Sequence, residues 1–373
     1  MAQALKEQFG DAAIMALAQS IVRVYPAFAR EDFLAQARQG FEALDLMARG
    51  RHLAAALRRH LPPDPGEALR ILTRAMGPKL EKSEGNGMAS FFYLPHSFFV
   101  AEYGLEHFDA AMDLQYELTQ RFTAEFSIRP FLERDPQRTM TRLLHWATDP
   151  SAQVRRLVSE GTRPRLPWAP RLKTFEANPE PVLKLLEMLK DDPEVYVRRS
   201  VANHLNDLGK DHPRLLLEIA KRWLEDAPEP RRILLRHALR SLVKSGDREA
   251  LQLLGFGRKP EVKVESVKIS PRRVLLGERV RVAFALRNLR GKPQELLVDL
   301  RVHFVKGGGE ARPKVFKLRS LTLGGAEVVN LQKTISLAQL STRKHYTGRH
   351  EVEALINGRA VPLGDFLLSA GKP

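Results

Sequence analysis

The chain has 373 residues, a formal net charge of +16 and no cysteine. This length favours two or more domains, and the absence of cysteine excludes both a disulfide framework and a thiolate metal site. No run of about 18 apolar residues occurs, and the N-terminus MAQALKEQFG lacks the apolar segment of a signal peptide. We therefore expect a soluble, cytoplasmic protein with no membrane segment.

The positive charge is concentrated in the last two thirds of the chain. Residues 1–120 carry 12 basic and 15 acidic side chains, residues 121–260 carry 27 and 19, and residues 261–373 carry 21 and 10. Such a distribution is expected of a region that faces nucleic acid. A basic protein without a nucleic-acid partner is the alternative that charge alone leaves open.

The first part of the chain is predicted to be helical. Apolar residues recur at spacings of three and four from Ile14 to Val24, and this periodicity extends over residues 1–80. The prolines of LPPDPG at 61–66 break the pattern. From 105 to 250, further helical segments alternate with Pro, Asp and Gly breaks.

Within this helical region one stretch of sequence recurs after 43 residues. DPSAQVRRLVSE at 149–160 corresponds to DPEVYVRRSVAN at 192–203, and the helical segments before them, 138–148 and 180–190, correspond as well. A weaker third copy, ILLRHALRSLVKSGD, covers 233–247. Repeats of this length are typical of paired helices stacked as a HEAT or armadillo solenoid, and three copies are enough to bury a continuous core.

After FGRKP at 256–260 the pattern changes from helical to strand-like. Runs such as EVKVESVKI, ERVRVAFALRN and ELLVDLRVHFV are rich in β-branched residues, alternate with period two, and are separated by glycine-rich turns. About seven short strands in such a length fit an immunoglobulin-like β-sandwich. We therefore predict a mainly α protein, with a HEAT-like α-α superhelical solenoid over 1–257 and a C-terminal immunoglobulin-like β-sandwich over 258–373.

Two carboxylates occur among the arginines of the repeat. Glu160 takes the position of Asn203 in the next copy, and Asp207 lies one turn beyond Asn203. Because equivalent faces of stacked repeats line one surface, Glu160 and Asp207 should project into the same groove. Acids oppose phosphate binding there, so they suggest stabilisation of a developing sugar cation. An ion pair with Arg156 or Arg199 is the alternative.

The segment GTRPRLPWAPRLK, between the two main copies, places Trp168 among three prolines and beside Arg163 and Arg165. An exposed indole in such a loop is a stacking surface for a sugar or a base. A tryptophan that fills the gap between repeats is the alternative. Farther upstream, Glu125 lies beside two phenylalanines, and an ion pair with Arg129 at i+4 is the simpler explanation for this acid.

The sequence contains no motif for a metal or a cofactor. No HxxxH or HExxH occurs, and neither GxxxxGK[ST] nor GxSxG is present. We therefore expect no cofactor and no metal.

The chain resembles the alkylation-repair DNA glycosylases of the AlkC/AlkD type, and among them the AlkC branch. The motifs that carry the resemblance lie within residues 1–255: ALDLMARGRHLAAALRRHLP (43–62), LTQRFTAEFSIRPFL (118–132), HWATDPSAQVRRLVSEGTRPRLPWAPRL (145–172) and DPEVYVRRSVANHLNDLGKDHP (192–213). A C-terminal β-sandwich is found in part of the AlkC branch.

The resemblance implies an N-glycosylase that acts on cationic lesions in double-stranded DNA, chiefly 3-methyladenine and also 3-methylcytosine, without flipping the base into a pocket. A cationic base is already a good leaving group, so carboxylates beside the deoxyribose need only favour the sugar cation and orient a water. Carried over to this chain, Glu125, Glu160 and Asp207 would be those acids, and Trp168 would pack on the sugar. We expect a monomer that associates with the nucleoid through DNA.

The residues expected to contact DNA fall into two groups. The recurring arginines of the repeats should neutralise backbone phosphates, whereas basic residues in the β-sandwich turns should reach the minor groove. The β-sandwich could instead serve only as a cap on the last repeat. The predicted DNA-binding residues are Arg156, Arg163, Arg165, Arg199, Arg236, Lys306, Arg343 and Lys344.

Two other functions remain open from the sequence. A HEAT-repeat scaffold without enzymatic activity could bind nucleic acid or an acidic partner through the same groove. An RNA-binding module is a third possibility, but the aromatic signals of such modules are missing.

Overall fold

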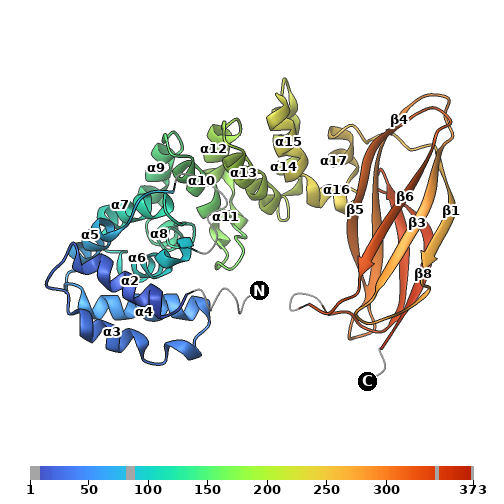
Figure 1. Cartoon of the computed structure of the whole chain (residues 1–373). Coiled ribbons are helices and arrows are strands. Elements are labelled where there is room, and N and C mark those ends of the chain that lie inside the picture. The colour runs from blue at the N-terminus through green and yellow to red at the C-terminus, as the bar shows by residue number, and fades with distance from the viewer. Residues whose placement is uncertain (1–8, 81–88, 341–343, 371–373) are drawn as a thin grey trace. The chain divides into compact units, whose positions relative to one another are not determined.

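The computed structural model describes residues 9–80, 89–340 and 344–370 (Figure 1). A helical region is followed by a C-terminal immunoglobulin-like β domain, which confirms the predicted fold class. By its contacts the chain forms two compact units, Met1–His212 with Ala227–Ala238, and Pro213–Asp226 with Leu239–Pro373. No helix among the described residues is long and apolar enough to cross a bilayer.

The first unit consists of helices joined by short turns, and local sequence explains where several of them begin. Asp45, Asp64 and Asp135 each accept a hydrogen bond from the backbone of the helix that follows, and prolines occupy the first helical position after two of them. The helices are α2 (Asp11–Val22), α3 (Arg30–Arg38), α4 (Leu46–His60), α5 (Pro65–Ala75), α6 (Leu94–Tyr103), α7 (Phe108–Thr119), α8 (Arg129–Arg134), α9 (Pro136–Trp146), α10 (Ala152–Gly161), α11 (Lys173–Ala177), α12 (Glu180–Leu189), α13 (Val195–Leu208) and α15 (Glu229–Ala238), with short 3₁₀ turns η1 (Phe41–Ala43) and η2 (Ala89–Tyr93).

The repeat predicted from sequence corresponds to the helix pairs α9–α10 and α12–α13. In Figure 1 these helices lie next to one another, and α10 packs directly on α13, which in turn packs on α15. Helices α10 and α13 begin 43 residues apart and bury equivalent apolar side chains, such as Val154 and Val197. The helices α10, α13 and α15 therefore form a row whose equivalent positions can be compared directly.

The two arginines of each doublet have different roles. Arg155 pairs with Asp192 across the repeats (Nε to Oδ2, 2.6 Å), and Arg198 donates to the backbone carbonyl of the same Asp192. Arg155 therefore links neighbouring repeats, whereas Arg198 holds the loop before its own helix. The second members, Arg156 and Arg199, lie on another face of their helices, where Arg156 pairs with Glu125 and Glu160 and Arg199 is exposed.

The second unit contains α14 (Pro213–Leu224), α16 (Arg240–Ser245), α17 (Arg248–Leu253) and the strands. One sheet has the order β1-β3-β6 and the other β2-β8-β7-β4-β5, and their facing side chains form one apolar core. The strands are β1 (Val262–Ser270), β2 (Arg273–Leu275), β3 (Arg279–Asn288), β4 (Gln294–Val305), β5 (Ala311–Leu323), β6 (Val328–Ser336), β7 (Gly348–Ile356) and β8 (Arg359–Ser369). Because three helices group with these strands, the division at 257/258 stays a prediction.

Candidate functional site

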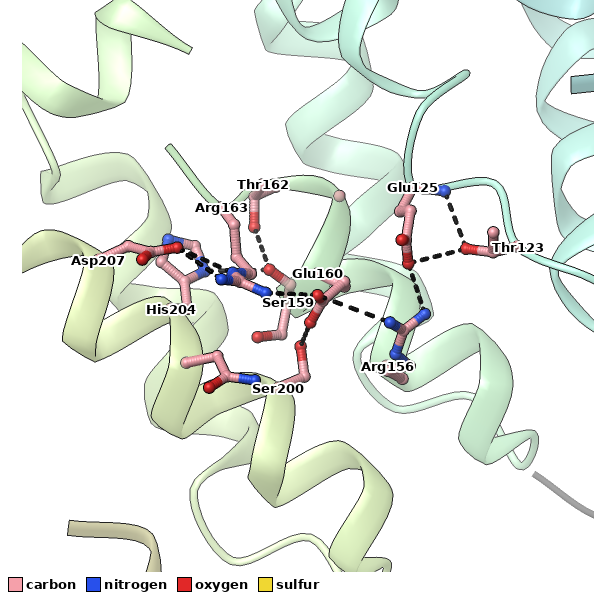
Figure 2. A network of polar contacts seen from close by, with 12 residues as sticks. Thr123, Glu125, Arg156, Ser159, Glu160, Thr162, Arg163, Ser200, His204 and Asp207 are labelled. Carbon is pink, nitrogen blue, oxygen red and sulfur yellow. Dashed lines mark hydrogen bonds and ion pairs between the residues drawn. The ribbon is translucent and has the colours of Figure 1, made fainter. Parts of the chain in front are cut away.

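Acidic and basic side chains alternate along a chain of contacts on α10 and α13. Arg156 lies between Glu125 (Nη1 to Oε2, 2.6 Å) and Glu160 (Nη2 to Oε1, 3.6 Å). Arg163 lies between Glu160 (Nη1 to Oε1, 2.6 Å) and Asp207 (Nη2 to Oδ2, 2.8 Å). Figure 2 shows the two guanidinium groups and the three carboxylates in this order. Three carboxylates from separate parts of the chain are thus joined into one network.

Local structure explains how each acid reaches the network. Glu125 lies in the turn before α8, where the Thr123 hydroxyl donates to Oε2 of Glu125 (2.9 Å) and accepts from its backbone N–H. Glu160 lies in the last turn of α10, four residues after Arg156, and is therefore on the same face of the helix. Asp207 lies in the last turn of α13, directly beside the end of α10.

Further hydrogen bonds hold the outer oxygens of two of the acids. The Ser200 hydroxyl donates to Oε2 of Glu160 (2.6 Å), and the Lys210 ammonium donates to Oδ1 of Asp207 (2.9 Å). Glu125 differs, because both of its contacts, with Thr123 and Arg156, use Oε2. Among the described residues no partner contacts Oε1 of Glu125, so this oxygen is available to a ligand.

The network is largely shielded from solvent. The side chain of Glu125 is 13% exposed, that of Glu160 8% and that of Asp207 3%. Burial disfavours the charged form of Arg163, but the carboxylates of Glu160 and Asp207 outweigh burial and raise its pKa. Because removing a charge from water costs several kcal/mol unless it is paired, the alternation of charges accounts for the burial.

Arg129 is hydrogen-bonded to the backbone beside the network. Its Nη1 donates to the carbonyls of Gly161 (3.1 Å) and Arg163 (2.8 Å), and its Nη2 donates to that of Pro170 (2.5 Å). Burial lowers the pKa of Arg129 to about 10. Arg129 thus holds the end of α10 and the loop that follows, while the partner of Glu125 is Arg156.

The ion pair that the sequence offered as the alternative for Glu160 is present, because Arg156 lies within 3.6 Å of it. The structure also brings Glu160 and Asp207 together, on either side of Arg163, as the repeat predicted. A paired carboxylate still carries its charge and can act on a bound cation, so the catalytic role of these acids stays a prediction.

Trp168 is 80% exposed and lies in the left-handed backbone region, with φ of 67°. It does not fill the gap between the repeats, which was the alternative. A left-handed conformation is unfavourable for a tryptophan, so the surrounding loop must impose it. The loop is closed by a hydrogen bond from Leu172 N–H to the Pro164 carbonyl (3.1 Å). The indole is therefore presented to solvent by a constrained loop.

The arginines predicted to contact DNA occupy different environments. Arg165 pairs with Asp211 (Nε to Oδ2, 3.0 Å), and the exposed Arg236 pairs with Glu229 (Nη1 to Oε1, 3.2 Å). Arg199 is exposed and lines a groove of about 270 Å³ between α13 and α15, whose other walls include Val195 and Ile233. Their contacts with DNA stay predictions, as do those of Arg156 and Arg163.

The basic residues predicted in the β-domain turns can be placed in part. Lys306 and Lys344 line a cavity of about 370 Å³ together with Arg312 and Lys314. Arg343 lies outside the described residues. The cavity gathers four cations at one end of the β domain, which suits a polyanion.

Sequence reasoning missed Lys210, Ser200 and Thr123, and it named Arg163 only as a DNA contact. Lys210 follows Asp207 by three positions, and Arg163 follows Glu160 by three, so helical spacing could have suggested both pairs. Ser200 and Thr123 gave no such signal, because their partners depend on how the helices pack. In the part of the chain that the structure describes, no group of three or more His, Asp or Glu side chains is arranged to hold a metal ion.

Fold and site together define a helical-repeat protein with a C-terminal immunoglobulin-like domain and a paired-carboxylate site on the repeats. Residues 263–370 match the family described as "Uncharacterised protein YhaZ, C-terminal Ig-like domain". The chain is 34% identical to "Uncharacterized protein YhaZ" of Bacillus subtilis (strain 168), over 97% of this chain and 98% of that protein.

A solved structure matches over almost the whole length. The Pseudomonas fluorescens alkylpurine DNA glycosylase AlkC, bound to DNA containing an abasic site analogue, is 39% identical and superposes with a TM-score of 0.91. The match covers 98% of this chain and 99% of that one. The chain belongs to the AlkC family, as the sequence motifs indicated.

Proposed function

We propose that the protein is a DNA glycosylase that excises cationic alkylated bases, chiefly the purine 3-methyladenine and also the pyrimidine 3-methylcytosine, from double-stranded DNA. The observation that carries this proposal is the set of three ion-paired carboxylates, in a chain that also exposes Trp168 in the loop after α10 and that matches AlkC over 98% of its length. It acts as a monomer and needs no cofactor.

The proposed reaction hydrolyses the N-glycosidic bond. The bond between C1′ and the base nitrogen breaks, and its electron pair neutralises the cationic base, so no protonation of the leaving group is needed. The sugar becomes oxocarbenium-like, water attacks C1′, and a carboxylate takes up the proton of that water. The products are the free base and an abasic site.

The geometry suggests how the acids divide this work. Glu160 and Asp207 have each oxygen engaged by a neighbour, so they act through their charge on the sugar cation. Glu125 keeps Oε1 for a water molecule, which suits it to orient the attacking water. Trp168 supplies an apolar surface on which the deoxyribose packs, so that the base can leave without entering a pocket.

The proposal is tested by incubating the purified protein with methylated DNA and measuring released 3-methyladenine. Glu125→Gln, Glu160→Gln and Asp207→Asn should each lower the single-turnover excision rate, on the order of 100-fold or more. DNA affinity should stay equal or rise, because a negative charge is removed from a surface that meets phosphates.

Glu106→Gln is the matched control, because Glu106 pairs with Arg134 on the exposed surface, away from the network. It should excise at the wild-type rate. Wild-type-like excision by all three site variants would reject the assignment of the acids. DNA binding without any base release by the wild type would favour the scaffold function instead.

A further inference from the structure

One arginine of the network, Arg163, contacts two of the proposed acids at once. Its Nε and Nη2 both donate to Oδ2 of Asp207 (2.9 and 2.8 Å), and its Nη1 donates to Oε1 of Glu160 (2.6 Å). Figure 2 shows the guanidinium between the two carboxylates. Only 7% of the residue is exposed, so nearly all of its donor capacity is directed inward.

The two carboxylates need such a partner. Both bond to one planar guanidinium, so they lie within a few ångströms of each other, and like charges at such a distance oppose each other's ionisation. The other charged groups around them are Arg156 on α10, Lys210 after α13, Glu125 before α8, and Arg129 behind the loop. Among the cations of the network, Arg163 is the one that bonds to both Glu160 and Asp207.

The position of Arg163 is itself fixed by its surroundings. It follows the end of α10, where the Thr162 hydroxyl donates to the Val158 carbonyl (2.7 Å) and closes the helix. Arg129 donates to the Arg163 carbonyl (2.8 Å), which anchors the backbone of that residue. The neighbouring His204 is fully buried, and burial lowers its pKa to about 3, so it adds no competing charge near neutral pH.

We infer that Arg163 is a positioning residue that sets the separation and orientation of Glu160 and Asp207 toward the sugar, and that it does not contact a DNA phosphate. This inference rests on the proposed function. It replaces the role predicted for Arg163 from sequence, because the guanidinium is buried between the two acids and its side chain is only 8% exposed, which leaves little surface for a phosphate.

The inference is tested with Arg163→Lys and Arg163→Ala, and with Arg134→Met as a control on an exposed ion pair. Both Arg163 variants should lose on the order of 100-fold in single-turnover excision at saturating enzyme. Their affinity for DNA with an abasic-site analogue should stay within about threefold of wild type, with an unchanged salt dependence. Lysine should not restore the rate, because one ammonium cannot bridge both acids in the planar geometry of a guanidinium.

Chemical rescue separates positioning from a general loss of structure. In Arg163→Ala, added methylguanidinium should fill the vacated space and raise the excision rate, whereas methylammonium at the same concentration should not. An unrescued Arg163→Ala that melts well below wild type would overturn the inference in favour of a structural role. If that variant does not fold, the split between rate and affinity in Arg163→Lys decides.

Two further results distinguish the remaining explanations. Wild-type excision rates combined with weaker DNA binding and a salt slope reduced by about one unit would show a phosphate contact. A wild-type protein that releases no base would reject the proposed function itself. Positioning is then read from crystals of Arg163→Ala with and without methylguanidinium, where unmoved carboxylates of Glu160 and Asp207 would overturn it.

Discussion

Buried charge is the dominant feature at the scale of single residues. Glu160, Asp207 and Arg163 are each less than a tenth exposed, yet each contacts an opposite charge within 3 Å. Removing Arg163 would leave Glu160 with Arg156 and Asp207 with Lys210, so the cost should lie below the roughly 3–5 kcal/mol of a fully broken buried pair. The arrangement therefore stores little net stability but fixes the side chains in one geometry, and a site that binds a short-lived sugar cation needs such preorganisation.

Two buried histidines should make stability depend on pH. Burial lowers the pKa of both His96 and His204 to about 3. Among the described residues, neither ring nitrogen of His96 has a hydrogen-bond partner, whereas Nδ1 of His204 lies 3.0 Å from the Ser159 carbonyl. Below pH 6.5 each histidine binds a proton in the unfolded chain and not in the folded one. The free energy of unfolding therefore decreases as pH falls.

The expected effect is measurable for His96. Its contribution to stability is fully present above about pH 6.5 and is lost progressively as pH falls toward 3. When the pH is lowered from 6.5 to 5, the free energy of unfolding should fall by about 2 kcal/mol less in His96→Leu than in wild type. Urea unfolding at the two pH values measures this difference, and parallel losses in both proteins would contradict it. His204 remains in the variant and keeps part of the wild-type dependence.

At the scale of elements, the row α10, α13 and α15 repeats one geometry with changed chemistry. Counted from the first residue of each helix, Glu160 corresponds to Asn203 and His237, and the last two are hydrogen-bonded (2.9 Å). By the same count Arg156 and Arg199 correspond to Ile233, so Arg236 lies one turn beyond the position that the sequence comparison suggested. The charge at this position therefore changes along the row, and of the three helices only α10 carries a carboxylate there.

The doubled arginines allow a paired test of DNA contact. Arg199→Met should weaken binding of any DNA sequence and lower the salt slope by about one unit, because an exposed groove cation is lost. Arg198→Met is the matched control on the same helix, because Arg198 donates to the Asp192 carbonyl and serves the fold. It should lower the melting temperature and leave the slope unchanged. Equal slopes for wild type and Arg199→Met would remove Arg199 from the DNA contacts.

At the scale of the whole molecule, the basic β domain is predicted to add DNA contacts to those of the helical region. Deleting residues 260–373 would also remove the strands from the helices that form one unit with them, α14, α16 and α17, so loss of activity would be ambiguous. Substitutions on the surface avoid this. The cavity lined by Lys306 and Lys344 is suited to such substitutions, because it contains the predicted DNA contacts that the structure describes.

The double change Lys306→Met and Lys344→Met should weaken DNA binding and reduce the salt slope by up to about two units. Lys263→Met is the control, because Lys263 already pairs with Glu265 on the sheet (3.4 Å). Titrations at several salt concentrations, with melting curves to confirm folding, measure the effect. Unchanged affinity and slope in the folded double variant would leave the β domain as a cap on the helical region.

The helical region, its 43-residue repeat and the presence of a β domain could be predicted from the sequence alone, because apolar periodicity is a local property. The proximity of Glu160 and Asp207 could be predicted as well, since stacked repeats carry equivalent positions onto one surface. Two long strands, β5 and β8, were not predicted from the sequence. In β5 the alternation of core-facing and exposed residues shifts by one position between Leu318 and Leu321, and β8 contains Pro362 and Gly364, which argue against a strand.

Which charged side chains contact each other depends on the tertiary structure. Arg163 and Asp207 are 44 residues apart, and Ser200 and Glu160 are 40 apart, so their contacts depend on how α10 packs on α13. The exposure of Trp168 likewise depends on a loop that Arg129 holds through the Pro170 carbonyl. Beyond the end of a helix, side-chain directions follow no regular period, so they cannot be predicted from the sequence. The role of Arg163 depends on the direction of such a side chain.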